Sequence, residues 1–336
     1  MARDDDLTPF ARAGPEPGST PMSMPKVLYI MGKGRIGSTL LNNVLGQLEG
    51  FFAIGELGHL WDRGLIQGKR CGCGLPVPDC PVWSVVGARA LAGDHGILTP
   101  ETVLAWQRRV LEWRGVPRML RQTPRASYSW DALGGYIDAT RRVYAALGEV
   151  TGARWVVEST KLPAAPVPLG LMAGVDGYVV HLVRDPRAVV HSWKRTRRWD
   201  PEDHEEMPRF GATYTTASWW MRNLLSEVVR RRRGPSTSLL VRYEDFVDDP
   251  KKTIASVLEL IGEAIPDLSW LDEAELQLAT HSVGGNPLRL DPRPLALQRD
   301  EAWRTEQPLR DRLVATVFAT PFLQRYGYAG IGRRAK

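Results

Sequence analysis

The sequence predicts an α/β fold in which a parallel sheet is flanked by helices. Short apolar runs rich in β-branched and aromatic residues are typical of buried strands, and they recur along the chain between segments of helical periodicity. Strands that alternate with helices in this way form a parallel sheet covered on both faces. A glycine-rich segment at 32–37 lies between the first such strand and the first helix, which is the arrangement of a phosphate-binding loop.

Five strands are predicted, each from a short apolar run bounded by glycine or polar residues. Their ranges are 26–31, 51–56, 153–160, 177–185 and 236–246. Helical patterns are found at 38–48, about 100–114, 130–150, 186–198, 250–263 and 308–319. A further long helix is predicted from apolar residues that share one helical face, namely Phe210, Tyr214, Ala217, Met221, Leu224 and Val228. Gly234 ends this helix, and the arginine run before it is interpreted as a cationic last turn rather than a nucleic-acid site.

Residues 26–336 are predicted to form a single domain, with an irregular and helical insertion at 64–150. The chain has 336 residues, of which 43% are hydrophobic, and this is enough for a core. Residues 1–25 contain five prolines and three consecutive acids, so they are predicted to be a disordered tail without a secretory signal. No apolar run reaches the roughly 18 residues needed to cross a bilayer. Three cysteines do not make a full disulfide framework, and a cytoplasmic location is therefore expected.

The segment "GKGRIGST" (32–39) has the features of an anion-binding loop. Its glycines let the backbone approach a ligand closely, and the N–H groups at the start of the next helix favour an anion. Ser38 and Thr39 add hydroxyl donors, and Arg35 adds a planar cation suited to phosphate oxygens. A nucleoside triphosphatase carries a lysine where Ser38 stands and also needs a magnesium ligand. Asp185 follows a strand, but its flanking arginines favour a salt bridge over a metal.

A second anion site is predicted where the strand at 177–185 ends. Arg184 leaves the carboxyl end of this strand, where ligands bind in open α/β sheets. Ser192 lies eight residues later on the following helix, so the two side chains could hold a second phosphate. A structural pairing of Arg184 with Asp185 is the alternative. The formal net charge of +6 fits an enzyme for anionic ligands, but it fits a binder of nucleic acid or membrane surface equally well.

Two separate anion sites indicate a nucleotide whose phosphate groups are far apart. In "GKGRIGSTLL" (32–41) and "VRDPRAVVHS" (183–192) the sequence resembles the sulfotransferases that use 3′-phosphoadenosine 5′-phosphosulfate (PAPS), and "VRYEDFVDDP" (241–250), "GNPLRLDP" (285–292) and Trp303 support this. The bacterial and carbohydrate- or tyrosine-type branches are the most similar. The resemblance implies a P-loop-like fold and PAPS as co-substrate, with no metal requirement. The expected nucleotide-binding residues are Gly34, Arg35, Ile36, Gly37, Ser38, Thr39, Arg184, Ser192, Asn286 and Arg289.

Three residues are expected to be catalytic. Arg35 is placed to stabilise the leaving phosphate. The resemblance implies that Glu56 is the general base and that Lys161 contacts the transferred group or the bridging oxygen. To act near neutral pH, Glu56 needs a raised pKa or an acceptor held very close. His59 is the alternative base.

Several features stay open. The acceptor is expected to be a hydroxyl of a small molecule or glycan, not a nucleic acid, and the insertion at 64–150 is expected to shape its pocket. Cys71, Cys73 and Cys80 are spaced irregularly for zinc, and only His59 or His95 is a candidate fourth ligand, so no metal site is expected. A glycine-rich lid beside the acceptor pocket with unreactive thiols is expected instead, and a redox-linked disulfide is the alternative. A kinase or hydrolase on the same fold, or a non-catalytic anion binder, are the rival functions.

Overall fold

The computed structural model describes residues 24–93, 96–124, 128, 130–196, 198–200, 205–273, 280–290, 293 and 297–328. The expected N-terminal tail lies outside the described residues up to position 23, and so does His95.

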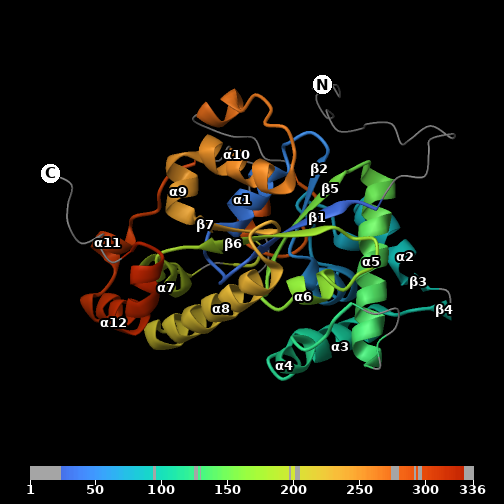
Figure 1. Ribbon diagram of the computed structural model, residues 1–336, viewed down its shortest axis with the longest axis horizontal. Helices are drawn as coiled ribbons and strands as arrows, with labels where there is room; N and C mark the ends of the chain where they lie inside the picture. Colours follow the sequence, from blue (N-terminus) through green and yellow to red (C-terminus); the bar gives the residue numbers. More distant parts are fainter. Residues whose placement is uncertain are drawn as a thin grey trace, which may run out of the picture.

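A five-stranded, fully parallel sheet forms the centre of the fold (Figure 1). Across the sheet the strands are β2 (Phe51–Gly55), β5 (Trp155–Lys161), β1 (Lys26–Met31), β6 (Gly177–Val183) and β7 (Ser238–Arg242). All five predicted strands are present, but β7 is shorter than predicted. It ends at Arg242 because Glu244 and Asp245 lie in the first turn of a helix, where acidic side chains are favourable. A separate two-residue pair joins β3 (Ala92–Gly93) to β4 (Gly96–Ile97).

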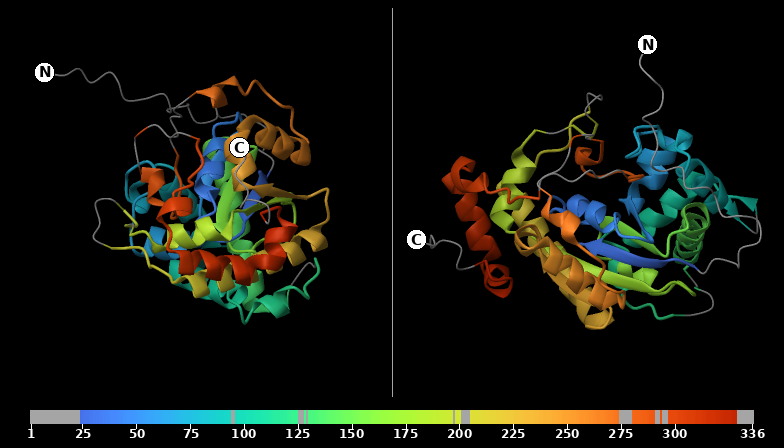
Figure 2. Two further views of the ribbon diagram at one scale, coloured as in Figure 1. Left: turned by 90° about the vertical axis from the view of Figure 1, so that its left-hand side faces the viewer. Right: turned by 90° about the horizontal axis from the view of Figure 1, so that it is seen from above.

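Helices cover both faces of this sheet. The helices of one face are α2 (Trp83–Leu91), α3 (Pro100–Leu111), α4 (Val116–Met119), α5 (Asp131–Thr151) and α6 (Pro166–Leu169). The others are α1 (Ser38–Leu45), α7 (Pro186–Lys194), α8 (Ala212–Arg233), α9 (Tyr243–Asp248), α10 (Pro250–Ile261), α11 (Trp303–Glu306) and α12 (Leu309–Arg325). The helices α11 and α12 lie at one end of the molecule, and the insertion lies at the other (Figures 1 and 2).

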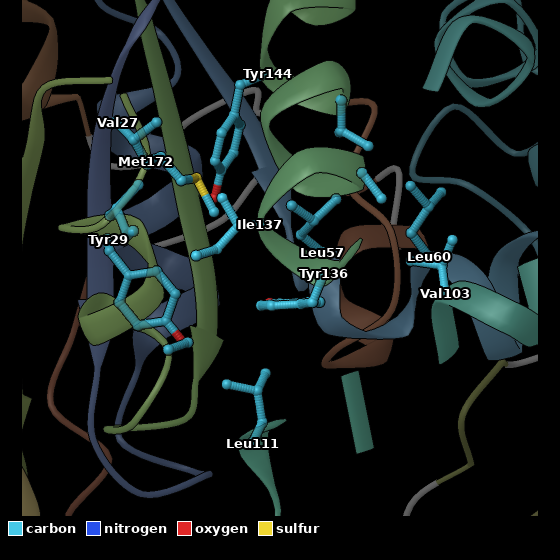
Figure 3. Close-up of a cluster of buried hydrophobic side chains, with 14 of the residues drawn as sticks. Val27, Tyr29, Leu57, Leu60, Val103, Leu111, Tyr136, Ile137, Tyr144 and Met172 are labelled. Atoms are coloured by element: carbon cyan, nitrogen blue, oxygen red, sulfur yellow. The ribbon is translucent and has the colours of Figure 1, made fainter. Parts of the chain in front are cut away.

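Successive side chains of β1 point to opposite faces of the sheet, so this strand contributes to two hydrophobic cores. Val27 and Tyr29 point to the side of α5, where Tyr136 and Tyr144 pack in the same cluster (Figure 3). Leu28 and Ile30 belong to the core on the opposite face, with α1 and α10. Since successive side chains of a strand point to opposite faces, a run such as "KVLYIM" must be apolar throughout when both faces are covered.

The prediction for the buried face of α8 is wrong. Tyr214, Met221 and Val228 of the predicted apolar face are exposed by 58%, 44% and 39%. The buried face of α8 instead consists mostly of small or polar residues, together with one tryptophan. These buried residues include Thr215, Thr216, Trp219, Asn223, Ser226 and Glu227. These polar groups are tolerated because they are paired: Asn223 bonds the ring of His181 at 2.8 Å, and Glu227 accepts a hydrogen bond from Arg325 at 2.6 Å.

Two helix ends were predicted with different success. α8 ends at Arg233 before Gly234, as predicted, and Arg232 and Arg233 donate to backbone carbonyls of neighbouring segments. α7 ends at Lys194, earlier than the predicted position 198. Across the part of the chain that the structure describes, no helix is long and apolar enough to cross a membrane.

Candidate active site

Four polar segments meet at the carboxyl edge of the sheet. The glycine-rich loop follows β1, Glu56 follows β2, Lys161 ends β5 and Arg184 follows β6. Because all strands run in the same direction, these segments lie along one edge, and all four line a single cavity of about 670 Å³. The two anion sites were predicted at strand ends from the sequence, whereas Glu56 and Lys161 were expected at the site from the family resemblance.

The loop after β1 places backbone and hydroxyl groups at the cavity. Gly37 has a φ of 86°, and a Cβ atom there would lie 2.4 Å from the Tyr243 ring, so only glycine fits. The residues Gly34, Gly37, Ser38 and Thr39 line the cavity as expected. The side chain of Ile36 is buried in the core beneath the loop, so this residue has only its backbone to offer a ligand.

Arg35 and Lys33 lie on the ring of Trp193. The Arg35 guanidinium is 4.9 Å and the Lys33 ammonium 5.0 Å from the ring centre, and all three residues line the cavity. Burial and the nearby charge of Arg222 lower the pKa of Lys33 to about 7. Sequence reasoning missed Lys33, Trp193 and Arg222 as site residues. For Lys33, the available signal was its position inside the glycine-rich loop.

Arg184 contacts the loop directly. Its Nη1 donates to the Arg35 carbonyl at 3.2 Å, and its Nη2 lies 3.3 Å from Oδ2 of Asp300. Among the described residues the buried Nε of Arg184 has no hydrogen-bond partner, which leaves a donor for a ligand. Asp185 instead pairs with Arg187, which excludes the proposed structural pairing of Arg184 with Asp185. Ser192 also lines the cavity.

Glu56 is ion-paired with Lys161 and lies beside His59. Lys161 Nζ contacts Oε1 of Glu56, and His59 Nε2 is 3.5 Å from Oε2. Burial alone raises the pKa of Glu56, but Lys161 and His59 outweigh it and lower the pKa to about 2. A raised pKa, one of the two conditions named for this base, is therefore absent in this arrangement, because the sequence did not reveal that Glu56 and Lys161 are paired. Burial lowers the pKa of Lys161 despite this pairing.

Backbone strain coincides with the two expected catalytic cations. Among the described residues other than glycine, only Arg35 and Lys161 have a positive φ, at 73° and 69°. This conformation costs about 1–3 kcal/mol for each residue, and such residues cluster at functional sites. Both side chains line the same cavity.

Asn286 and Arg289 were expected to bind the nucleotide, and Trp303 supported the family resemblance. Asn286 lines the main cavity, as expected. Arg289 does not join it there: it donates to the Arg70 carbonyl at 3.1 Å and lines a small separate cavity. Trp303 is buried between the guanidinium groups of Arg187 and Arg304, each 4.9 Å from its ring, which is a packing position.

Apolar and aromatic side chains also line the cavity, among them Leu104, Leu162, Met207, Phe210, Tyr214 and Leu288. Met207 and Phe210 contact Arg35 and Trp193, so they lie beside the glycine-rich loop. A second cavity of about 250 Å³ adjoins the main one and shares Gln107, Arg108, Leu162 and Arg222 with it. Leu104, Gln107 and Arg108 belong to α3, so part of the insertion borders the main cavity.

These features define a transferase of an anionic group, because cations and loop amides face a buried carboxylate across one cavity. Residues 26–267 match the model of the sulfotransferase family. This match covers most of the chain, which therefore belongs to the sulfotransferase family.

Comparison with solved structures shows the same fold. The sulfotransferase domain of the olefin synthase from Synechococcus PCC 7002 has a TM-score of 0.50 and 20% sequence identity, over 93% of this chain and 98% of that one. The sulfotransferase domain from the curacin biosynthetic pathway has a TM-score of 0.49 and 15% identity, over 89% of this chain and 98% of that one. Among curated proteins, none is significantly similar in sequence.

Proposed function

We propose that the protein transfers a sulfuryl group from PAPS to a small-molecule hydroxyl, with Glu56 as general base. The observation that carries this proposal is the ionised, buried carboxylate of Glu56 beside Lys161, in the same cavity as the loop cations. A base must lie within hydrogen-bond reach of the hydroxyl that it deprotonates, and this carboxylate lines the cavity that would hold the acceptor.

The donor is held at both ends. The amides of the loop and the hydroxyls of Ser38 and Thr39 bind the 5′-phosphosulfate at the start of α1. Arg184 and Ser192 bind the 3′-phosphate. The contact between Arg184 and the backbone of Arg35 supports a single bound nucleotide, because it brings the two anion sites into one cavity.

The reaction is an in-line displacement at sulfur. The acceptor oxygen forms a bond to sulfur while the bond from sulfur to the bridging oxygen of the donor breaks, and adenosine 3′,5′-bisphosphate leaves. The acceptor proton passes to Glu56. Arg35 and Lys161 stabilise the charge that develops on the bridging and phosphate oxygens.

Donor binding explains how a carboxylate with such a low pKa becomes a base. Without donor, Lys161 neutralises Glu56. When Lys161 turns toward the bridging oxygen, Glu56 keeps its burial but loses its closest cation, so its pKa rises. The base is thus strongest when the sulfuryl group is in place.

The acceptor has a hydroxyl attached to an apolar body. Aliphatic and aromatic side chains form part of the cavity lining, and the adjoining cavity of about 250 Å³, lined by residues such as Leu111, Trp113 and Val116, extends it along α3. A screen of phenols, alcohols and sugars with labelled PAPS tests this, and sugars are expected to be the poorest acceptors. Better turnover of free sugars than of phenols of similar size would contradict it.

Titration with adenosine 3′,5′-bisphosphate tests the donor site. Arg184→Ala should weaken binding about 10- to 100-fold, because hydrogen bonds to charged groups contribute about 1.5–3 kcal/mol. Arg231→Ala removes the same charge from an exposed position in the last turn of α8 and should leave affinity unchanged. Equal binding by both variants would exclude the 3′-phosphate role of Arg184.

Magnesium separates this function from the rival kinase or hydrolase. Phosphoryl transfer from a nucleoside triphosphate needs the ion, whereas the proposed reaction does not. We expect turnover with PAPS to be unchanged on adding Mg²⁺, and no turnover of ATP. Strong stimulation by Mg²⁺ would favour the rival.

A further inference from the structure

Four metal-binding side chains converge away from the active-site cavity. They are Cys71, Cys73 and Cys80 from the irregular segment before α2, together with His281. One sulfur or ring nitrogen from each lies within 4.8 Å of all the others. Sequence reasoning missed the fourth donor because His281 is 201 residues from Cys80.

Backbone hydrogen bonds hold the two segments together. The Gly72 amide donates to the Ser282 carbonyl at 2.9 Å, and the Trp83 indole donates to the His281 carbonyl at 2.6 Å. The ring of His281 stacks on Phe52 of β2, with centroids 6.0 Å apart. The imidazole therefore has a fixed position and orientation, which is what a ligand to a structural metal requires.

The cluster is built for a cation. Cys71 and Cys80 are fully buried, and Cys80 Sγ lies 3.3 Å from His281 Nδ1. The cluster thus places three sulfurs and one imidazole nitrogen within ligand reach of a common centre, and soft donors of this kind suit a transition-metal ion.

We propose that Cys71, Cys73, Cys80 and His281 bind one Zn²⁺ ion in a tetrahedral structural site. Three cysteines and one histidine form a common zinc ligand set, and their thiolate character favours zinc over hard cations. Ligands at zinc distances of roughly 2.0–2.3 Å lie about 3.5–4 Å from one another, which the cluster reaches with small side-chain adjustments. Four protein ligands leave no open position, so the ion has no part in sulfuryl transfer.

The ion would join the cysteine segment to a wall of the active site. Val283, two residues after His281, pairs with Gly55, and its carbonyl accepts from the Glu56 amide at 2.8 Å. Gly285 packs directly against the side chain of Glu56, because a Cβ atom at position 285 would lie 2.6 Å from Oε1 of Glu56. The zinc site would therefore fix the position of the segment that packs against Glu56.

Metal analysis of the full chain, purified without a histidine tag, tests the proposal. Elemental mass spectrometry should find one zinc per chain in wild type. Cys73→Ser and His281→Gln should each weaken zinc binding more than about 100-fold, since loss of an outer-shell partner alone costs 10- to 100-fold. Cys73 is exposed, so its replacement should leave the fold intact by circular dichroism. His191→Gln is the matched control and should keep its zinc.

A second measurement identifies the ligands. Cobalt(II) added to metal-free reduced protein should give the thiolate charge-transfer and d–d bands of a tetrahedral site, and Cys73→Ser should weaken the charge-transfer bands. Three outcomes would overturn the proposal. They are wild type that takes up no zinc under reducing conditions, a disulfide among the three cysteines in freshly purified protein, and zinc retained at wild-type affinity by both variants. A stoichiometric metal other than zinc would refute the assignment of the ion.

Discussion

Lys161 and Glu56 form an ion pair between the end of β5 and the segment after β2, and their side chains are only 12% and 11% exposed. Each charge keeps the other ionised in a place where a lone charge would be costly. In the proposed mechanism, this pairing keeps Glu56 from acting as a base until the donor attracts the ammonium group of Lys161.

Glu56→Gln should remove the base without disturbing the donor site. Turnover is expected to fall about 100- to 10,000-fold, the usual contribution of general base catalysis. Affinity for adenosine 3′,5′-bisphosphate should stay within a few-fold, as measured by calorimetry. His59→Gln is the comparison and should cost less than tenfold. A large loss of turnover in His59→Gln, with little loss in Glu56→Gln, would show that His59 is the base.

The same Glu56→Gln variant should show the stabilising effect of a lowered pKa. The pKa of Glu56 falls from the ordinary 4.5 to about 2, so its ionisation stabilises the fold above pH 4.5. That stability is lost as pH falls toward 2, and it amounts to about 3 kcal/mol. Urea unfolding at several pH values should show wild type gaining on the variant as pH rises from 2 to 5. A constant difference would contradict the lowered pKa.

Glu158 should show the opposite behaviour. Burial raises its pKa from 4.5 to about 7, although hydrogen bonds from Thr160 and Tyr144 oppose this. Its ionisation is therefore unfavourable in the fold, and stability present below pH 4.5 is lost as pH rises through 7. Glu158→Gln should gain about 3 kcal/mol on wild type between pH 4 and 8 in urea unfolding. A gain by wild type over this range would refute the raised pKa.

Lys161→Gly and Lys161→Ala separate backbone strain from charge. Both remove the ammonium group, so their effects on Glu56 are equal, but only glycine adopts a φ of 69° without strain. The glycine variant should be more stable by about 1 kcal/mol, which reverses the usual order of these residues in a strand. Urea unfolding of both variants measures this. If the alanine variant is as stable as the glycine variant or more stable, the backbone at position 161 relaxes out of the strained conformation.

Arg187→Ala should be a defect of folding rather than of binding. Its guanidinium bonds the buried Asp185 and the Tyr328 carbonyl. Removing one partner of a buried pair costs about 3–5 kcal/mol. We expect a lower free energy of unfolding with nearly unchanged affinity for adenosine 3′,5′-bisphosphate, the inverse of the Arg184→Ala profile. A loss of affinity without a loss of stability would assign Arg187 to the nucleotide.

The convergence of the site was predictable because it follows from strand direction. Once the strands are parallel, residues after their carboxyl ends must share one edge, and this placed Glu56, Lys161 and Arg184 together. The anion-binding loop was equally predictable, since its glycines and Ser38 all lie within residues 32–38. Local patterns were sufficient for both.

What the sequence could not supply were partners from distant segments. The low pKa of Glu56 depends on a lysine about a hundred positions away, and the fourth member of the cysteine cluster is even farther. The buried face of α8 was misjudged for a related reason: Asn223 and Glu227 are buried against specific partners, His181 and Arg325, and no periodicity encodes them.

The pairing of Val283 with Gly55 has a consequence for how the chain can be divided. The segment matching the family ends at position 267, yet Gly285, Asn286 and Asp300 border the site from beyond it. A fragment stopped at 267 would retain every strand of the sheet but leave Glu56 without the segment that packs against it. It would also lose Phe322, Leu323 and Tyr326, which belong to the core shared with α1 and α10. The last fifth of the chain therefore contributes to both the hydrophobic core and the cavity wall, so trimming it should destabilise the fold as well as open the site.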